Sequence, residues 1–229
     1  MGEREIAIDG IFGAKTQATI RRLQERRGIP ESGEVDQTTW WVLAFEAPLS
    51  VVDAVDMTDV KLWPTHLYVN DGTSHVVDSF GASRGGAMLI DRLLTQHPAH
   101  SVALLRIHGH GTPGHQYVAS GTDSESSSAF SAGHFNIPEA VADYRRLGTI
   151  MKPYGSIELR GCHVAVGSNG RMLLSGMAHA CGVPVTAAFR SQYGGYGANR
   201  FEGPTLTCFP DDTLTLTSWA QRVFSQCQW

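Results

Sequence analysis

The sequence lacks any long apolar run and any excess of basic residues, and its 229 residues include only four cysteines. A membrane-spanning helix needs about 20 consecutive apolar residues, so no membrane span is expected. Lysine and arginine together number 18, against 22 aspartates and glutamates. That balance leaves no surplus of positive charge to neutralise nucleic-acid phosphates, and nucleic acid is not an expected partner.

The four cysteines are too few and too unevenly spaced to form a disulfide scaffold, and none lie in a Cys-x-x-Cys zinc pattern. His108 and His110 have a spacing known from metal sites, but no cysteine or carboxylate pattern completes one. We therefore expect neither a metal nor another cofactor. At least one cysteine needs an individual explanation.

The N-terminus also lacks the apolar segment of a secretory signal, because it opens on the charged stretch Met-Gly-Glu-Arg-Glu-Ile. We expect the chain to be cytoplasmic as made. Export to the periplasm or to a target cell would need a secretion route that uses no leader.

Residues 1–46 predict a small helical module made of two helices joined by turns. Its motifs follow in a dense order: Asp9-Gly10, Phe12-Gly13, Lys15-Thr16, Leu23-Gln24, Gly28-Ile29-Pro30, Val35-Asp36 and Thr39-Trp40. This order resembles the peptidoglycan-binding-like domain of bacterial cell-wall enzymes. The usual helix before the Asp-Gly turn is missing, so the module looks truncated. A helical cap that merely packs on the next domain is the alternative.

Residues 47–64 have a weak pattern with prolines and scattered acidic residues, and we predict a linker there. From residue 65 to 229 the pattern alternates between short apolar strands and amphipathic helices. Such alternation predicts an α/β domain with a parallel sheet covered by helices on both faces. The expected strands are 67–69, 102–107, 156–160 and 183–188, and the expected helices are 87–94, 138–147 and 170–181.

Two of these strands end in a glycine next to a reactive side chain, in His108-Gly109-His110-Gly111 and in Arg160-Gly161-Cys162-His163. Reactive residues of such sheets collect beyond the carboxyl ends of the strands. An imidazole within reach of a thiol stabilises the thiolate and later protonates the leaving group. Gly111 and Gly161 would let the backbone pass close to a substrate and offer N–H groups to an oxyanion.

Over residues 65–188 these motifs resemble the caspase-like, or clan CD, cysteine peptidases, in an uncharacterised bacterial branch. The resemblance implies a caspase-like α/β/α sandwich with Cys162 as nucleophile and His110 as general base. His108 is the alternative base, and His163 is a secondary candidate that we expect to point away. Cys162 as one more buried cysteine is the alternative without catalysis.

The loop after the last predicted strand would shape the substrate pocket of such a peptidase, and it contains Arg190 and Tyr193. A guanidinium can receive an acidic side chain, whereas a loop of tyrosine and glycine can hold a small residue or a glycan. The sequence leaves this choice open.

Three functions remain in view, each with a peptide or peptidoglycan partner. The first is a Cys-His peptidase that cleaves amide bonds, bacterial and associated with the cell wall. The second directs the same dyad at peptidoglycan stem peptides, as an amidase or peptidase secreted as an antibacterial effector. The third is a non-catalytic module that binds the wall or a protein.

Overall fold

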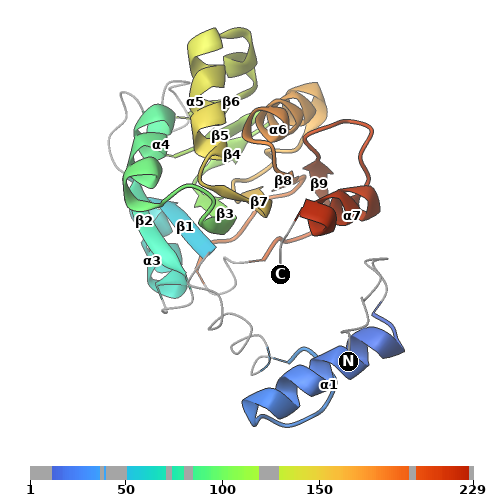
Figure 1. Ribbon diagram of the computed structural model, residues 1–229. Helices are drawn as coiled ribbons and strands as arrows, with labels where there is room; N and C mark the ends of the chain where they lie inside the picture. Colours follow the sequence, from blue (N-terminus) through green and yellow to red (C-terminus); the bar gives the residue numbers. More distant parts are fainter. Residues whose placement is uncertain are drawn as a thin grey trace.

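The computed structural model describes residues 12–36, 39, 51–70, 74–79, 85–118, 129–195 and 200–226 (Figure 1). A six-stranded sheet has the strand order β2-β1-β3-β7-β8-β9. Neighbouring strands run parallel except β9, which is antiparallel to β8. The strands are β1 Val51–Asp56, β2 His75–Ser79, β3 Val102–His108, β7 Met151–Leu159, β8 Val185–Ala188 and β9 Thr205–Cys208.

Helices cover both faces of this sheet, which confirms the predicted α/β/α sandwich (Figure 1). Helices α4, α5 and α6 pack on the apolar face, and α3 and α7 lie on the other. The helices are α1 Ala14–Arg27, α3 Trp63–Val69, α4 Gly85–Gln96, α5 Pro138–Gly148, α6 Gly167–Cys181 and α7 Leu216–Gln226, with short 3-10 turns η1 Val60–Leu62 and η4 Ala132–Asn136.

A second, three-stranded antiparallel sheet follows β3 directly and has the order β4-β5-β6. It consists of β4 Gly111–Thr112, β5 His115–Tyr117 and β6 Ala129–Ser131. Pairing of Gly111 with Gln116 folds the chain back immediately after the end of β3. This small sheet therefore fixes the turn that carries His110.

The predicted linker at residues 47–64 was wrong from residue 51 onward. Val51–Asp56 forms β1, a strand paired with β2 on one side and β3 on the other, and Val52, Ala54 and Val55 are buried. Two of the acidic residues that made this segment look like a linker are buried as well: Asp53 is 0% and Asp56 1% exposed, and Asp53 pairs with Arg106. The sheet therefore begins before residue 65.

The predicted strand at 67–69 was also wrong, because this stretch ends α3. Pro64 lies in the first turn of the helix, where its missing N–H costs nothing. Only Thr65 and Val69 of this helix are buried, a spacing of four that matches one face of a helix, while Leu67 is 75% exposed. A three-residue apolar run does not distinguish the two structures.

One face of the large sheet carries a row of polar side chains across its strands. Asp53 is registered with Arg106, Arg106 with Glu158, Glu158 with Thr186, and Thr186 with Thr207. Side chains alternate between the faces of a strand, so the neighbouring positions supply the apolar core on the opposite face. The polar row crosses β3 and β7 near their carboxyl ends.

The N-terminal module is organised around the side chain of Gln24, which is 0% exposed. Its Nε2 donates to Ser32 Oγ, the Glu34 carbonyl and Thr39 Oγ1, and its Oε1 accepts from the Gly33 amide. Helix α1 ends at Gly28, whose left-handed φ of 65° suits glycine. The predicted second helix around residue 40 lies mostly outside the described residues.

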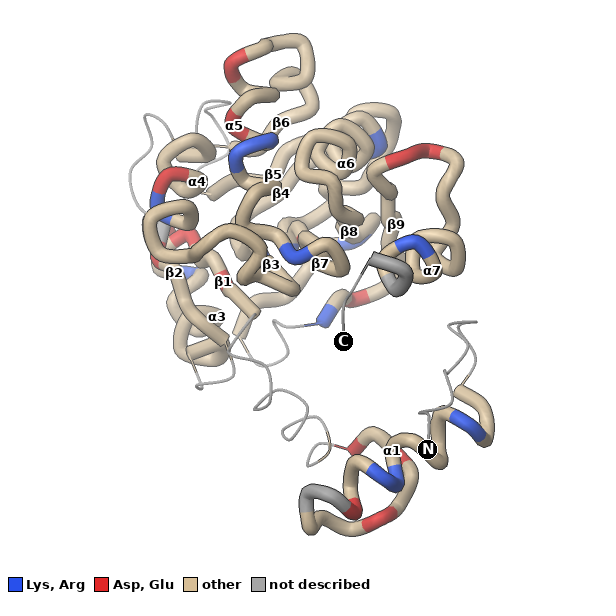
Figure 2. The backbone as a smooth tube through the Cα atoms, viewed as in Figure 1, with Lys and Arg blue, Asp and Glu red and all other residues tan. Residues whose placement is uncertain are grey.

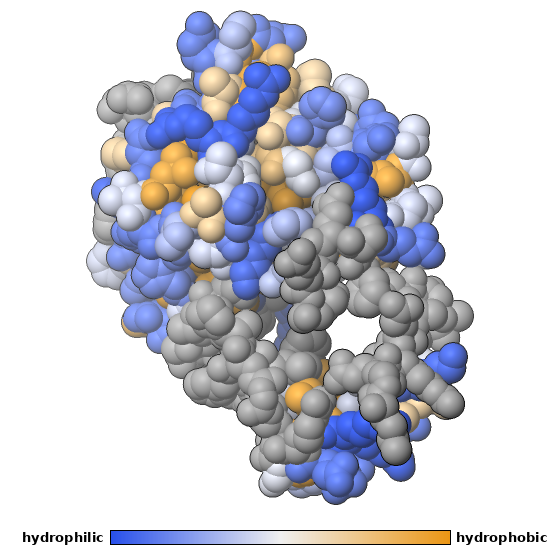
Figure 3. Space-filling view, in the orientation of Figure 1, coloured by the Kyte–Doolittle hydropathy of each residue, from blue (hydrophilic) through white to orange (hydrophobic). Residues whose placement is uncertain are grey.

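Charged residues of both signs are spread over the helices and loops (Figure 2). The face seen in Figure 3 is mainly hydrophilic with smaller hydrophobic areas. Among the described residues, no helix combines the length and apolar character needed to cross a bilayer.

Candidate active site

A cavity of about 220 Å³ opens where β3 and β7 end. Both strands are neighbours in the sheet and run parallel, so their carboxyl ends meet at one edge (Figure 1). The chain segments that line the cavity come from η1, α3, both strand ends and the loop after β8. They contribute Lys61, Leu62, Thr65, His108, Gly109, His110, Arg160, Cys162, Gln192, Tyr193, Gly194, Arg200 and Glu202.

Gly111 and Gly161 allow the turns that carry His110 and Cys162 to touch. A Cβ at Gly161 would lie 2.8 Å from the His110 carbonyl oxygen and 2.9 Å from the Gly111 Cα. A Cβ at Gly111 would lie 2.8 Å from the Cys162 backbone nitrogen. Real Cβ atoms do not approach so closely, and hence only glycine fits at these two positions without a backbone shift.

Gln116 links the same two turns by hydrogen bonds from its side chain. Its side chain is 0% exposed, Oε1 accepts from the Gly161 amide at 2.7 Å, and Nε2 donates to the Tyr117 carbonyl at 3.0 Å and to the His110 carbonyl at 3.4 Å. The predicted oxyanion role of the Gly161 N–H is therefore wrong, because that donor is already engaged. Gly161 instead serves the close approach of the turns.

Replacing Gln116 with leucine is expected to lower the free energy of unfolding by about 1–3 kcal/mol, because the buried Gly161 amide loses its acceptor. We also expect slower alkylation of Cys162, since its turn loses its link to the His110 turn. Urea unfolding and the rate of iodoacetamide labelling measure the two effects. Gln96→Leu, on the exposed end of α4, is the matched control, and equal behaviour of both variants would contradict the linking role.

His110 is held by a carboxylate that the sequence did not single out. Its Nε2 lies 2.5 Å from Asp59 Oδ2, and the side chains of the two are 32% and 11% exposed. Asp59 is also tied down by the Lys61 amide, which donates to its Oδ1 at 2.8 Å at the start of η1. Burial opposes ionisation of Asp59, but the hydrogen bonds from His110 and the Lys61 amide outweigh it and lower the pKa of Asp59.

With Nε2 bound to Asp59, Nδ1 is the ring nitrogen of His110 that can exchange a proton in the cavity. A carboxylate that fixes one ring nitrogen of a histidine also stabilises its protonated form. An imidazole oriented in this way can act as a general base.

His108 has a different environment, although it lines the same cavity. It is 3% exposed, and its Nε2 lies 2.6 Å from Asp53 Oδ1, while Arg106 binds the same carboxylate through Nε at 2.7 Å and Nη2 at 2.5 Å. Burial lowers the pKa of His108 despite the neighbouring carboxylate. These contacts fit a supporting role of His108 better than the alternative of a general base.

Burial works against the charge of Asp53, but His108 and Arg106 overcome it and lower the pKa of Asp53 to about 2. The carboxylate therefore stays ionised between its two partners. This buried group contacts the cavity through His108, which is one of the lining residues.

Cys162 is half-buried and free of disulfides. The Gln192 amide donates to its Sγ at 3.2 Å, and the Gln192 carbonyl oxygen lies 3.6 Å from the same sulfur. An N–H donor stabilises a thiolate. The Gln192 side chain in turn pairs with the backbone of Glu202 through both its oxygen and its nitrogen, at 3.1 Å each, which fixes the loop that supplies the amide.

Two other predicted site residues lie outside the cavity. The imidazole of His163 contacts the Phe189 carbonyl and Ser191 Oγ, consistent with the expectation that it points away. Arg190 is exposed and does not line the cavity, so its predicted place in the substrate pocket was wrong. Tyr193 does line it, and Arg160 and Arg200 contribute the guanidinium groups there.

The remaining described cysteines have buried surroundings. Cys181 donates to the Tyr144 carbonyl, and burial raises the pKa of its thiol to about 12. Burial also raises the pKa of Cys208. Among the residues that the structure describes, no three His, Cys, Asp or Glu side chains gather as a metal site.

The sequence alone did not identify Asp53, Asp59, Gln116 or Gln192 as parts of this site. Asp53 and Asp59 fell in the segment interpreted as a linker, and the two glutamines carry no motif. One local signal was present: Asp59 precedes Val60-Lys61-Leu62 as a helix-capping residue does.

Comparison with known families matches residues 2–43 to the family described as "Putative peptidoglycan binding domain". The matched residues support association with the bacterial wall and a peptidoglycan partner. Neither the curated proteins nor the solved structures that were compared with the chain gave a match.

Proposed function

We propose that this chain is a cysteine hydrolase that cleaves amide bonds in the stem peptides of peptidoglycan, with Cys162 as nucleophile and His110 as general base. One observation carries the proposal: Cys162 and a histidine oriented by Asp59 line the same cavity at the carboxyl edge of the sheet. The match of residues 2–43 to a peptidoglycan-binding family supports the choice of substrate.

In the proposed reaction the Cys162 thiol gives its proton to His110 Nδ1, and the thiolate adds to the carbonyl carbon of the scissile amide. Collapse of the tetrahedral intermediate breaks the C–N bond, and the protonated His110 donates its proton to the leaving nitrogen. Water, deprotonated by His110, then hydrolyses the thioester to a carboxylate and restores the thiol. Asp59 remains ionised throughout and holds the imidazolium.

The test is digestion of purified peptidoglycan sacculi, followed by measuring the free amino groups released. We expect the full chain to release them and Cys162→Ala to release none, while Cys208→Ala, which removes a thiol outside the cavity, retains activity. When the proteins are expressed in bacteria with an added periplasmic leader, the full chain and Cys208→Ala should arrest growth, whereas Cys162→Ala should not. Release by Cys162→Ala at the rate of the unmodified chain would exclude Cys162 as nucleophile.

A non-catalytic wall-binding protein is the second candidate, and the match of residues 2–43 is the observation that favours it. It predicts that the full chain and the Cys162→Ala variant co-sediment equally with sacculi, and that neither releases amino groups.

Toxicity of the expressed chain in the cytoplasm instead of the periplasm would point to a protein substrate.

A further inference from the structure

Glu202 is a carboxylate in the cavity wall whose hydrogen-bonding capacity is not used up. Its backbone is fixed by the Gln192 side chain on both sides. Its Oε2 is enclosed and has no hydrogen-bond partner within the described part of the chain. A buried acceptor without a donor is costly, which makes such an atom a sign of an absent partner.

The lysine and arginine side chains that line the cavity give it positive charge, while the carboxylates Asp59 and Glu158 stand behind His110 and Arg160. Lys61 and Arg200 lie exposed at its rim. Arg160 lies deeper, at 7% exposure, paired with Glu158 and stacked 3.9 Å from the Phe201 ring centre. Glu158 offsets much of the Arg160 charge, so the lining presents two cations at the rim and one carboxylate in the wall.

A ligand with charge of only one sign would pair either with the rim cations or with Glu202, but not with both. An acidic group placed against Lys61 and Arg200 would leave Glu202 Oε2 without a donor. An ammonium group placed on Glu202 would bring no anionic group of the ligand to the two rim cations. A group that carries an ammonium and a carboxylate on the same carbon matches both sides.

We propose that this cavity binds a zwitterionic amino-acid head group, with its ammonium on Glu202 and its carboxylate on Arg200 and Lys61. The χ3 torsion of a glutamate is soft, so the carboxylate can turn toward a donor in the cavity. The inference rests on the proposed function for its substrate class. Among wall peptides, a diamino dicarboxylic residue such as diaminopimelate carries this head group at the end of its side chain.

Binding to the full-length Cys162→Ala chain tests the proposal separately from catalysis. Three synthetic stem peptides, Ala–γ-D-Glu–X–D-Ala, differ only in the side-chain end of X: meso-diaminopimelate has both charges, lysine the ammonium alone, and 2-aminopimelate the carboxylate alone. Isothermal titration calorimetry measures each affinity. Because loss of a charged hydrogen bond weakens binding by about tenfold or more, we expect the diaminopimelate peptide to bind at least about tenfold tighter than either other peptide.

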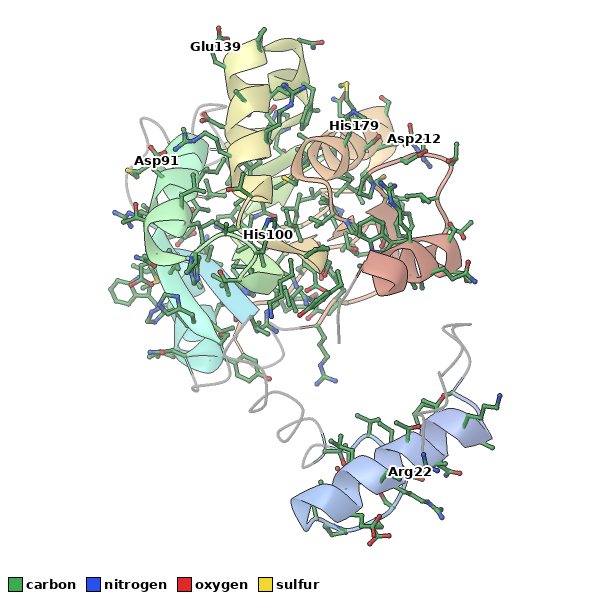
Figure 4. The ribbon with its side chains drawn as sticks, viewed as in Figure 1. Arg22, Asp91, His100, Glu139, His179 and Asp212 are labelled. Atoms are coloured by element: carbon green, nitrogen blue, oxygen red, sulfur yellow. The ribbon has the colours of Figure 1, made fainter. Side chains whose placement is uncertain are left out.

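Two charge-neutralising substitutions, added to the Cys162→Ala chain, assign the contacts. Glu202→Gln should remove the advantage of diaminopimelate over 2-aminopimelate, and Arg200→Gln should reduce its advantage over lysine. Glu139→Gln and Arg145→Gln, on the exposed side of α5 (Glu139 in Figure 4), should leave all three affinities unchanged.

Equal affinity for the three peptides, or a preference that survives Glu202→Gln, would overturn the zwitterion site. Failure of the Cys-His chemistry would show instead as undigested sacculi with this binding preference intact. The two failures are therefore distinguishable.

Discussion

His110→Gln is expected to lower kcat/KM for the release of wall peptides by about two to four orders of magnitude, the usual contribution of a general base. Glutamine keeps much of the size and hydrogen-bonding capacity of histidine but cannot exchange the proton. The same variant should also slow the alkylation of Cys162 at neutral pH, because the imidazole can no longer take up the thiol proton. Mass spectrometry of labelled peptides separates Cys162 from the other cysteines.

Two histidine substitutions serve as comparisons. His163→Gln, whose ring lies outside the cavity, should leave both measurements near those of the unmodified chain. A greater loss of activity in His108→Gln than in His110→Gln, at equal stability, would assign the base to His108 and contradict our choice.

Asp59→Asn should show a smaller loss of activity than His110→Gln, because it disturbs the orientation of the imidazole and leaves the base present.

Asp53→Asn is expected to destabilise the fold by about 3–5 kcal/mol, the usual cost of removing one partner from a buried ion pair. The substitution keeps the shape of the side chain but leaves the Arg106 guanidinium, whose side chain is 10% exposed, without its counter-charge. It also gives His108 an amide in place of a carboxylate. Urea unfolding at neutral pH measures the change.

Asp91→Asn is the matched control, because Asp91 pairs with Arg146 on the surface, where both side chains are about half exposed (Figure 4). An exposed pair contributes at most about 1 kcal/mol. Similar losses in the two variants would contradict a special role for the buried network.

The same network gives the unmodified protein an acid-sensitive stability. The folded state lowers the pKa of His108, so acidification below about 6.5, the usual histidine value, favours the unfolded chain, which binds the proton more readily. The folded state also lowers the pKa of Asp53 to about 2, and its contribution, present above the ordinary value of about 3.9, is lost as the pH falls toward 2. Asp53→Asn should lack this lower part of the acid transition.

Much of the fold could be predicted because the sequences of its central strands are themselves typical of strands. Val102–Ile107 and Ile157–Leu159 are mainly apolar stretches, each with one charged residue, that lead to glycine-flanked reactive residues, and the structure confirms strands at both. β1 was missed because Asp53 and Asp56 break its apolar pattern. Asp53 is acceptable in a buried strand because it pairs with Arg106 and His108, 53 and 55 positions away, and pairings over such distances cannot be read from the local sequence.

The candidate site likewise contains residues that the sequence could predict and residues that it could not. Cys162 and His110 stand out as reactive residue types at the ends of predicted strands. Their partners do not, because Gln116 and Gln192 act through backbone groups brought near by folding. Arg190 was placed in the pocket by its position along the chain, whereas its side chain lies outside and the more distant Arg200 lies at the rim.

The walls of the cavity are joined by a hydrogen bond from the Gly195 amide to Thr65 Oγ1, two residues 130 positions apart. Contacts of such long sequence separation form late, because a long loop must first be closed. The enclosure around Cys162 is consequently completed only when most of the chain has been synthesised and folded. A nascent or threaded chain would carry the thiol and the imidazole as separate, unassembled groups, and the assembled site would belong to the finished fold alone.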